Sequence, residues 1–187
     1  MKLFKILVFS VITIFSLNNI ALAESALNKI LSSGVLKAGT TGDFPPFSKR
    51  DTATNEYEGF DIDVLKELAK DMDVEIEFVP TDWKTLVNGI VSNKYDISTS
   101  ASLSVKRALS SGYTNSYFKL ATVPLTLISN LNKFKSWEDI NRKDITVAVT
   151  LGTTQEQQAK QLFPKATLNI IESPARDFQE VLAGRSN

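Results

Sequence analysis

The chain has 187 residues, with 21 lysines and arginines balanced by 21 aspartates and glutamates, and it contains no histidine and no cysteine. The balanced charge argues against a nucleic-acid partner. The lack of cysteine excludes a disulfide framework, and the lack of histidine removes the commonest metal ligand and general base. We therefore expect no metal and no cofactor, and any catalysis would rest on carboxylates, lysines, tyrosines or hydroxyls.

The first 23 residues have the pattern of a cleaved secretory signal peptide. Lys2 and Lys5 precede an apolar run over residues 6–17, and residues 21–23 (Ala-Leu-Ala) supply a small-residue cleavage site. A single membrane anchor is the alternative, although the run is short for a bilayer. No cysteine follows the cleavage point for lipid attachment. The pattern predicts export to a bacterial periplasm, and the mature chain would keep 19 basic and 21 acidic side chains.

The first half of the mature chain alternates short apolar runs with amphipathic ones. This alternation predicts helices at residues 26–31, from Asp61 to 72 and from Asp82 to 91, strands at 35–40, 74–79 and 95–98, and a loop over 41–57. Asp61 and Asp82 are each expected to cap the helix that follows. Strands that alternate with helices predict a parallel sheet with covered faces.

The second half predicts a second α/β unit. Residues 122–128 are expected to form a strand that crosses between the units, because Pro124 favours an edge or crossing position. Helices at 136–140, 154–162 and 175–182 and strands at 145–149 and 167–171 are expected to follow.

The predicted architecture is therefore a two-lobed α/β fold. It places lobe 1 at residues 24–121, a crossing strand or hinge at 122–130, and lobe 2 at 131–187. A second sheet of two strands is small. We therefore expect a truncated second lobe and a protein that continues beyond Asn187.

A serine-rich loop between residue 98 and Arg107 is a candidate carboxylate site. Serines stand at the alternate positions 98, 100, 102 and 104, and alternate side chains of an extended segment share a face. The planar guanidinium of Arg107 could bind both oxygens of a carboxylate. The alternative is a surface loop with a solvated arginine.

Two more loops follow predicted strands, at the carboxyl edge where open α/β sheets bind ligands. In residues 39–48 the glycines would allow close backbone approach, and Phe44 and Phe47 could cover a ligand. An ordinary turn with both rings in the core is the alternative. Residues 151–156 form a strand-to-helix turn whose N–H groups suit an anion.

Two further side chains near these loops have two interpretations each. Glu156 stands in the first turn of a predicted helix, where it could be a catalytic acid or a charge that compensates the helix dipole. Trp83 could form a wall of the pocket or belong to the core.

Several segments together resemble the family 3 periplasmic solute-binding proteins. No single motif carries this resemblance, which rests on the order and spacing of GTTGDFPPF (39–47), GFDID (59–63), SLSVKR (102–107), YTNSY (113–117) and LGTT (151–154). The resemblance implies a monomeric two-lobed clamp, the type 2 periplasmic binding protein fold. It also implies an amino-acid or small carboxylate ligand, and a membrane permease of an ABC transporter as partner.

The resemblance also implies roles for individual residues. Arg107 corresponds to the carboxylate-binding arginine, Ser102 to the hydroxyl beside it, and Phe44 to the aromatic ring over the ligand, while Ser100 stands where glycine is common. Thr153 and Thr154 are implied to be the contribution of the second lobe. The predicted ligand-binding set is Asp43, Phe44, Trp83, Ser100, Ser102, Arg107, Thr153 and Thr154.

Within that family, TTGDFPPFS (40–48) and PTDW (80–83) are similar to cyclohexadienyl dehydratases. These share the fold but remove water and carbon dioxide from prephenate or arogenate. Such a lyase needs an acid that protonates the leaving hydroxyl, and Glu156 is the candidate here. A binding protein is the preferred prediction, a dehydratase is the alternative, and the ligand-binding part of a membrane receptor is a third hypothesis.

Overall fold

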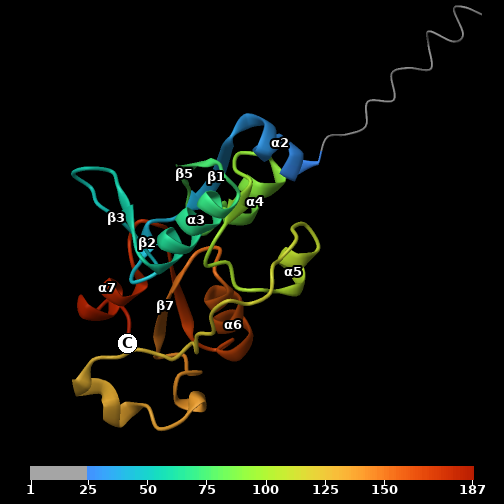
Figure 1. Cartoon of the computed structure of the whole chain (residues 1–187). Coiled ribbons are helices and arrows are strands. Elements are labelled where there is room, and N and C mark those ends of the chain that lie inside the picture. The colour runs from blue at the N-terminus through green and yellow to red at the C-terminus, as the bar shows by residue number, and fades with distance from the viewer. Residues whose placement is uncertain (1–24) are drawn as a thin grey trace, which may run out of the picture.

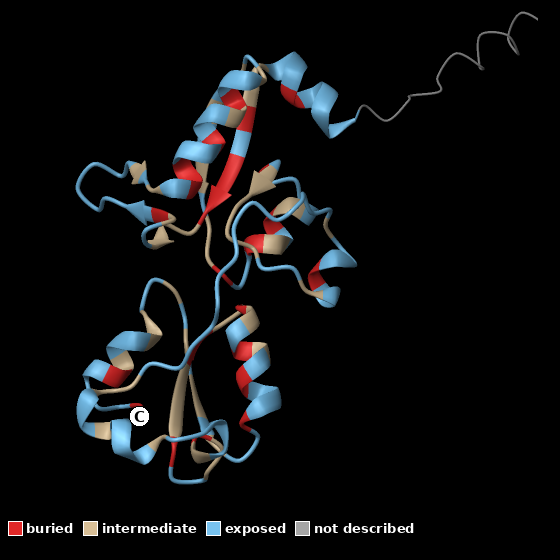
Figure 2. Ribbon diagram, turned by 60° about the horizontal axis from the view of Figure 1, so that its bottom comes forward, coloured by how far each residue is buried: buried red, intermediate tan, exposed pale blue. Residues whose placement is uncertain are grey.

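The computed structural model describes residues 25–187, so the predicted signal peptide lies outside the described residues. The described chain forms two bodies, which an exposed segment of chain connects (Figures 1 and 2). We call the body around strand β1 (Val35–Thr40) lobe 1 and the body around strand β7 (Thr146–Thr150) lobe 2. Both combine strands with helices, which confirms the predicted two-lobed α/β class.

Lobe 1 is built on a three-stranded parallel sheet of order β5-β1-β6. Its strands are β1 (Val35–Thr40), β5 (Glu75–Pro80) and β6 (Ile97–Ser98), and its helices are α2 (Ala26–Ser33), α3 (Phe60–Asp71), α4 (Leu86–Val91) and α5 (Val105–Ala108). Ile30, Leu36 and Ala69 form a buried cluster between the sheet and two of these helices. The structure confirms the parallel sheet that the alternating pattern predicts.

The expected loop after β1 instead contains a small antiparallel sheet. Its strands are β2 (Asp43–Phe44), β3 (Ser48–Arg50) and β4 (Tyr57–Glu58). Around this sheet, Phe47 contacts the rings of Phe44, Phe60 and Phe118, with ring centroids 5.1 to 6.0 Å apart. Phe47 thus belongs to an aromatic cluster that fixes the hairpin against α3.

Lobe 2 contains a two-stranded parallel sheet. Its elements are β7 (Thr146–Thr150), α6 (Thr154–Leu162), β8 (Thr167–Ile171), α7 (Asp177–Leu182), and the 3₁₀ helices Ile128–Lys133 and Trp137–Asp139. Its core consists of Ile140, Ile145, Val149, Ala159 and Phe163. Apart from the 3₁₀ helix Ile128–Lys133, which the sequence did not predict, these elements lie within a few residues of the predicted ones.

Two predicted helix caps are wrong. Helix α3 begins at Phe60 after Gly59, whose φ of 124° starts the helix, so Asp61 lies inside the first turn. Helix α4 begins only at Leu86, and the carboxylate of Asp82 accepts hydrogen bonds from the N–H and the hydroxyl of Thr85 instead. Trp83 therefore belongs to the loop before α4.

The crossing strand expected at residues 122–128 is also absent from the structure. Residues 119–127 have no helical or strand structure, and a 3₁₀ helix begins at Ile128. A strand needs a neighbouring strand to satisfy its backbone groups, and none of the three sheets of the described chain extends to this segment. Val123 and Leu125 are consequently exposed.

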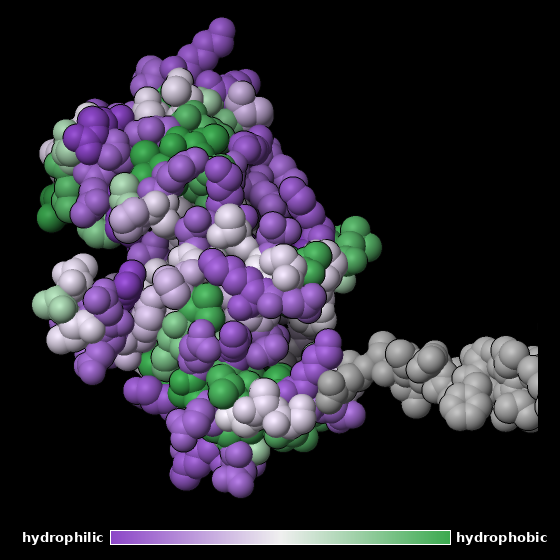
Figure 3. All heavy atoms as spheres, turned by 90° about the horizontal axis from the view of Figure 1, so that it is seen from above, coloured by the Kyte–Doolittle hydropathy of each residue, from purple (hydrophilic) through white to green (hydrophobic). Residues whose placement is uncertain are grey.

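The described surface mixes polar and apolar side chains. On the face in Figure 3, hydrophobic residues form several patches between hydrophilic ones. Within residues 25–187, no helix has the combined length and apolar character that a membrane crossing requires.

Candidate functional site

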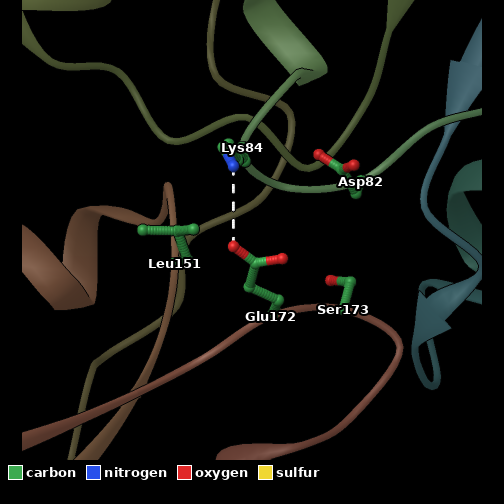
Figure 4. A pocket seen from close by; sticks show the side chains of 5 residues that line it. All are labelled: Asp82, Lys84, Leu151, Glu172 and Ser173. Atoms are coloured by element: carbon green, nitrogen blue, oxygen red, sulfur yellow. Dashed lines mark hydrogen bonds and ion pairs between the residues drawn. The ribbon is translucent and has the colours of Figure 1, made fainter.

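The two lobes meet at the carboxyl ends of their parallel strands. Figure 4 shows this junction from close by, with Asp82 and Lys84 of lobe 1 opposite Leu151, Glu172 and Ser173 of lobe 2. These five residues line a cavity of about 20 Å³, which is room for roughly one water molecule. The lobes are therefore in contact here, and the polar side chains at the junction make specific pairs.

Arg107 connects the two lobes. It lies on the single-turn helix α5, and it is only 7% exposed. Its Nη1 donates to the carbonyl oxygen of Ser102 at 2.9 Å, and its Nη2 donates to that of Gly152 in lobe 2, also at 2.9 Å. Both acceptors are uncharged, so these bonds orient the guanidinium without neutralising its charge.

The serine loop before Arg107 does not form one extended face. Ser100 has a φ of 60°, which turns the chain, and its hydroxyl donates to the carboxylate of Asp61. The hydroxyl of Ser98 donates to its neighbour's carbonyl, and that of Ser104 caps α5 by accepting the N–H of Arg107. The expectation of four hydroxyls on one side is therefore wrong.

The buried carboxylate of Asp61 holds this loop in place. Asp61 is 1% exposed, and besides Ser100 it accepts a hydrogen bond from the hydroxyl of Tyr117 at 2.9 Å. Burial, together with the charge of Asp61 and this bond, raises the pKa of Tyr117 to about 12. Asp61 thus ties the start of α3 to the arginine loop and to the segment that leaves lobe 1.

Asp43, Phe44 and Trp83 meet on the lobe 1 side of the junction. The indole N–H of Trp83 donates to Oδ1 of Asp43 at 2.9 Å, and the Trp83 and Phe44 rings pack edge to face with centroids 5.5 Å apart. From lobe 2, the hydroxyl of Ser173 donates to Oδ2 of Asp43 at 3.0 Å, and Nη1 of Arg176 lies 3.7 Å from Oδ1. Both oxygens of Asp43 are therefore engaged.

The turn after β7 supplies the lobe 2 side. The side chain of Thr153 caps α6 by accepting the N–H of Glu156 at 3.1 Å, and its hydroxyl donates to the carbonyl of Thr150 at 2.7 Å. The hydroxyl of Thr154 donates to the amide oxygen of Gln155. Both threonines make bonds within their own turn, while Gly152 contacts lobe 1.

Glu156 is a buried carboxylate with two donors. It accepts the N–H of Gly152 at 2.7 Å and the ammonium of Lys160 at 2.5 Å. Burial raises the pKa of Glu156, but these two hydrogen bonds and the charge of Lys160 outweigh it, so the pKa lies below its ordinary value. Glu156 is therefore ionised at neutral pH and carries no proton to donate.

The junction includes residues that sequence reasoning did not select. Gly152 accepts a hydrogen bond from Arg107 and donates one to Glu156. Its position in the turn after β7 could have marked it in the sequence as a site residue. Ser173 and Arg176 follow β8, so their position at the carboxyl edge of a strand could have marked them. Ser102 contacts Arg107 through its carbonyl and Ser100 contacts Asp61, whereas Asp43, Phe44 and Trp83 form a separate group beside Ser173.

The model of the family described as bacterial extracellular solute-binding proteins, family 3, matches residues 36–170. The chain belongs to this family. Proteins of this family are typically periplasmic or extracellular, and membership supports a solute-binding role.

Relatives in the family include both an enzyme and binding proteins. The chain is 33% identical over 165 residues to a cyclohexadienyl dehydratase from Pseudomonas aeruginosa, covering 88% of this chain and 61% of the relative. It is 28% identical to an L-cystine-binding protein from Bacillus subtilis, covering 83% of this chain and 56% of the relative. The chain thus spans about three fifths of the length of these relatives.

A solved structure shows the same fold. The crystal structure of an ancestral amino acid-binding protein, AncCDT-1, which is described as a precursor of cyclohexadienyl dehydratase, matches with a TM-score of 0.82 and 39% identity. The match covers 87% of this chain and 72% of that protein.

Proposed function

We propose that this chain belongs to a periplasmic solute-binding protein that captures an amino acid or a related small carboxylate between its two lobes. The protein would be exported by a signal peptide over residues 1–23 and would act as a monomer. It would deliver its ligand to the membrane permease of an ABC importer. The L-cystine-binding relative and the ancestral amino acid-binding protein support this class of ligand.

The observation that carries the proposal is the environment of Arg107. In the part of the chain that the structure describes, the buried guanidinium of Arg107 has only uncharged carbonyl acceptors, and a carboxylate is a stronger partner than a carbonyl. A ligand carboxylate that replaces the Gly152 carbonyl would therefore bind between the lobes. The Phe44 and Trp83 rings lie on the lobe 1 side of the same junction and would cover the rest of the ligand.

Calorimetric titration of the purified chain with a panel of amino acids and small carboxylic acids tests this proposal. Loss of one partner of a desolvated charge pair weakens binding by about 2–5 kcal/mol, or roughly 30-fold to several thousand-fold. Arg107→Ala should weaken the ligand by this factor. Arg107→Lys should also weaken it, because lysine lacks the two-pronged geometry.

Two variants serve as controls for this titration. Lys106→Ala removes the neighbouring exposed cation and should leave affinity within about twofold. Ser102→Ala keeps the carbonyl that holds Arg107, and the loss of a neutral hydroxyl changes affinity by about 1 kcal/mol at most. If Arg107→Ala binds within threefold of wild type while circular dichroism shows an intact fold, Arg107 does not bind the carboxylate.

A cyclohexadienyl dehydratase is the second candidate function, favoured by the 33% identical relative. The ionised state of Glu156 argues against Glu156 as the catalytic acid. Before Glu156 could take up and donate a proton, its contacts to Lys160 and Gly152 would have to break. Incubation with prephenate, followed by measurement of phenylpyruvate, separates the two functions. Turnover would support the dehydratase, and its loss in Glu156→Gln would identify Glu156 as the acid. Turnover that survives in Glu156→Gln would exclude Glu156 as the acid but keep the enzyme, whereas ligand binding without turnover supports the solute-binding protein.

A further inference from the structure

We propose that Arg176 is a specificity residue of the junction, which selects a ligand whose second polar group is a neutral amide rather than a charged group. The first polar group of that ligand is the carboxylate that Arg107 binds, so this inference rests on the proposed function and deepens it. The selection follows from the pairing of Arg176 with Asp43, which places charges of both signs at the same end of the junction.

Asp43 supplies the negative charge at that end. Its side chain is 10% exposed, its Oδ1 accepts the indole N–H of Trp83 at 2.9 Å, and its Oδ2 accepts the hydroxyl of Ser173 at 3.0 Å. Both donors are neutral, so with these donors alone the carboxylate would attract an ammonium or a guanidinium of a ligand. The structure instead places Arg176 of lobe 2 there, with its Nη1 3.7 Å from Oδ1 of Asp43.

The guanidinium of Arg176 has N–H donors that the described chain does not use. The ring of Phe178 lies 5.9 Å from its central carbon, which is within the range of a cation–π contact. Nε and Nη1 are buried, and neither has a hydrogen-bond partner among residues 25–187. A buried donor without an acceptor is unfavourable. Since Nη1 faces Asp43 across the contact between the lobes, a ligand oxygen inserted there would accept from it and gain affinity.

The two arginines belong to one continuous junction. Arg107 donates to the carbonyl oxygen of Gly152, and a Cβ on Gly152 would lie 2.7 Å from the carbonyl oxygen of Trp83. The indole of the same tryptophan donates to Asp43, which pairs with Arg176. A ligand that lies along Trp83 would therefore have Arg107 at one end and the Asp43–Arg176 pair at the other.

The pair of opposite charges decides which second group fits. An ammonium or guanidinium of the ligand would be attracted by Asp43 but repelled by Arg176, and a carboxylate would meet the reverse. Either charged group would also lose its hydration, which one attractive partner does not fully replace. An amide matches both charges, because its oxygen can accept from Arg176 and its N–H can donate to a remaining lone pair of the Asp43 carboxylate.

Calorimetric titration of the purified chain with matched pairs of amino acids tests this selection. L-citrulline and L-arginine have similar shapes, but citrulline ends in a neutral urea group and arginine in a guanidinium. L-glutamine and L-glutamate differ in the same way between an amide and a carboxylate. In each pair that binds, the neutral member should bind at least about tenfold tighter, because contact between like charges is unfavourable.

Variants that remove one charge at a time should change the preference in opposite directions. Arg176→Gln leaves Asp43 unpaired, so arginine should gain affinity relative to citrulline by at least about tenfold. Asp43→Asn leaves Arg176 unpaired, so glutamate should gain relative to glutamine by a similar factor. The double variant has no charge at this end and should again prefer the neutral amino acids. A folding defect would instead weaken all four ligands alike.

Arg185→Gln is the matched control for these variants. Arg185 also forms an ion pair within the described chain, with Glu180 of lobe 2, but it follows α7 whereas Arg176 precedes it, and its side chain is 61% exposed. The control removes the same charge from the same lobe. Because an exposed pair contributes little, both preferences should stay within about twofold of wild type.

The inference is overturned if wild type prefers the charged member of a pair, or if Arg176→Gln, folded by circular dichroism, keeps the wild-type preference. It is also overturned if Arg185→Gln changes the preference as much as Arg176→Gln does. A chain that binds only acids without an amide would keep the proposed function and reject this role of Arg176. A chain that binds no amino acid or carboxylic acid would refute the proposed function, and this inference with it.

Discussion

The two ends of the lobe junction carry opposite charges in different surroundings. At one end the guanidinium of Arg107 meets two backbone carbonyls, and at the other the carboxylate of Asp43 meets two neutral donors and a guanidinium. Within residues 25–187, Asp43 therefore has an ion-pair partner in Arg176, whereas Arg107 has none. The unpaired positive charge of Arg107 therefore suits an anionic ligand. The paired charge of Asp43 suits contact between the two lobes.

Among the changes that keep the Arg107 side chain, the largest expected effect comes from breaking its contact with Gly152 of lobe 2. Gly152 has a φ of 81°, and a Cβ there would lie 2.5 Å from Cα of Lys84 and 2.7 Å from the carbonyl oxygen of Trp83. Gly152→Ala should therefore force the lobes apart at this end and weaken ligand binding by about tenfold or more, as titration would show. Backbone strain of about 1–3 kcal/mol adds to the clash.

Gly184→Ala is the matched control for this variant. Gly184 has a φ of 70°, but a Cβ there would meet no atom within 4 Å. Gly184→Ala therefore introduces the same kind of backbone strain as Gly152→Ala but does not disturb the contact between the lobes. Equal loss of affinity in the two variants would assign the effect to strain rather than to the junction.

A smaller effect is expected when Glu156, which binds the N–H of Gly152, loses its ion pair with Lys160. Lys160→Met would leave the buried carboxylate of Glu156 without its cation. Because the ammonium of Lys160 is half exposed, we expect a loss of about 1–2 kcal/mol in the free energy of unfolding at pH 7. Urea denaturation measures this loss, with the exposed Lys143→Met as control.

The pH dependence of this variant follows from the lowered pKa of Glu156. Burial opposes the shift, but the hydrogen bond and charge of Lys160 and the N–H of Gly152 hold the pKa below its ordinary 4.5. The stabilisation is present above that value and is lost as pH falls through the lowered pKa. The difference between wild type and Lys160→Met should therefore shrink below pH 4.5, and a difference that grows in acid would contradict this assignment.

The smallest expected effect on the free energy of unfolding comes from removing the hydrogen bond between Tyr117 and Asp61 in lobe 1. Tyr117→Phe removes the hydroxyl that binds Asp61, a change of about 1 kcal/mol or less because Tyr117 is half exposed. Burial and Asp61 raise the pKa of Tyr117 from 10 to about 12. Its stabilisation is therefore complete below pH 10 and is lost as pH rises towards 12.

Urea denaturation at pH 8 and pH 11 checks this expectation. The Tyr117→Phe variant should lose less stability than wild type over that interval, and Tyr113→Phe should behave as wild type. An equal loss in the Tyr117→Phe variant and wild type would show that the hydroxyl of Tyr117 does not contribute.

The elements that the sequence predicts well are those with local signals. Strand β5 follows from the alternation of apolar and acidic residues, and helix α6 follows from a capping threonine at position 153. The strands β2 and β4 have two residues each, which is too short for a periodic pattern. Residues 122–128 read as a strand in sequence, but strand formation depends on a partner that no local pattern reveals.

The site shows the same division between local and long-range signals. Sequence reasoning located the loops around Asp43, Arg107 and Gly152, because each follows a strand or precedes a helix. It did not anticipate the turn at Ser100, since a serine with positive φ is uncommon and Asp61 stabilises it from a distant helix. The position of Arg176 after β8 was a local signal, but its pairing with Asp43 of the other lobe was not visible in the sequence.

The placement of the two tryptophans gives the protein an optical signal of its own. Trp83 is 9% exposed and binds Asp43 at the junction, whereas Trp137 is 53% exposed and stacks on Phe163 in lobe 2. Separation of the lobes would bring water to the indole of Trp83, shift its fluorescence to longer wavelength and make it accessible to acrylamide. Trp137 would emit unchanged as an internal reference, so opening and closing can be followed in real time without any label.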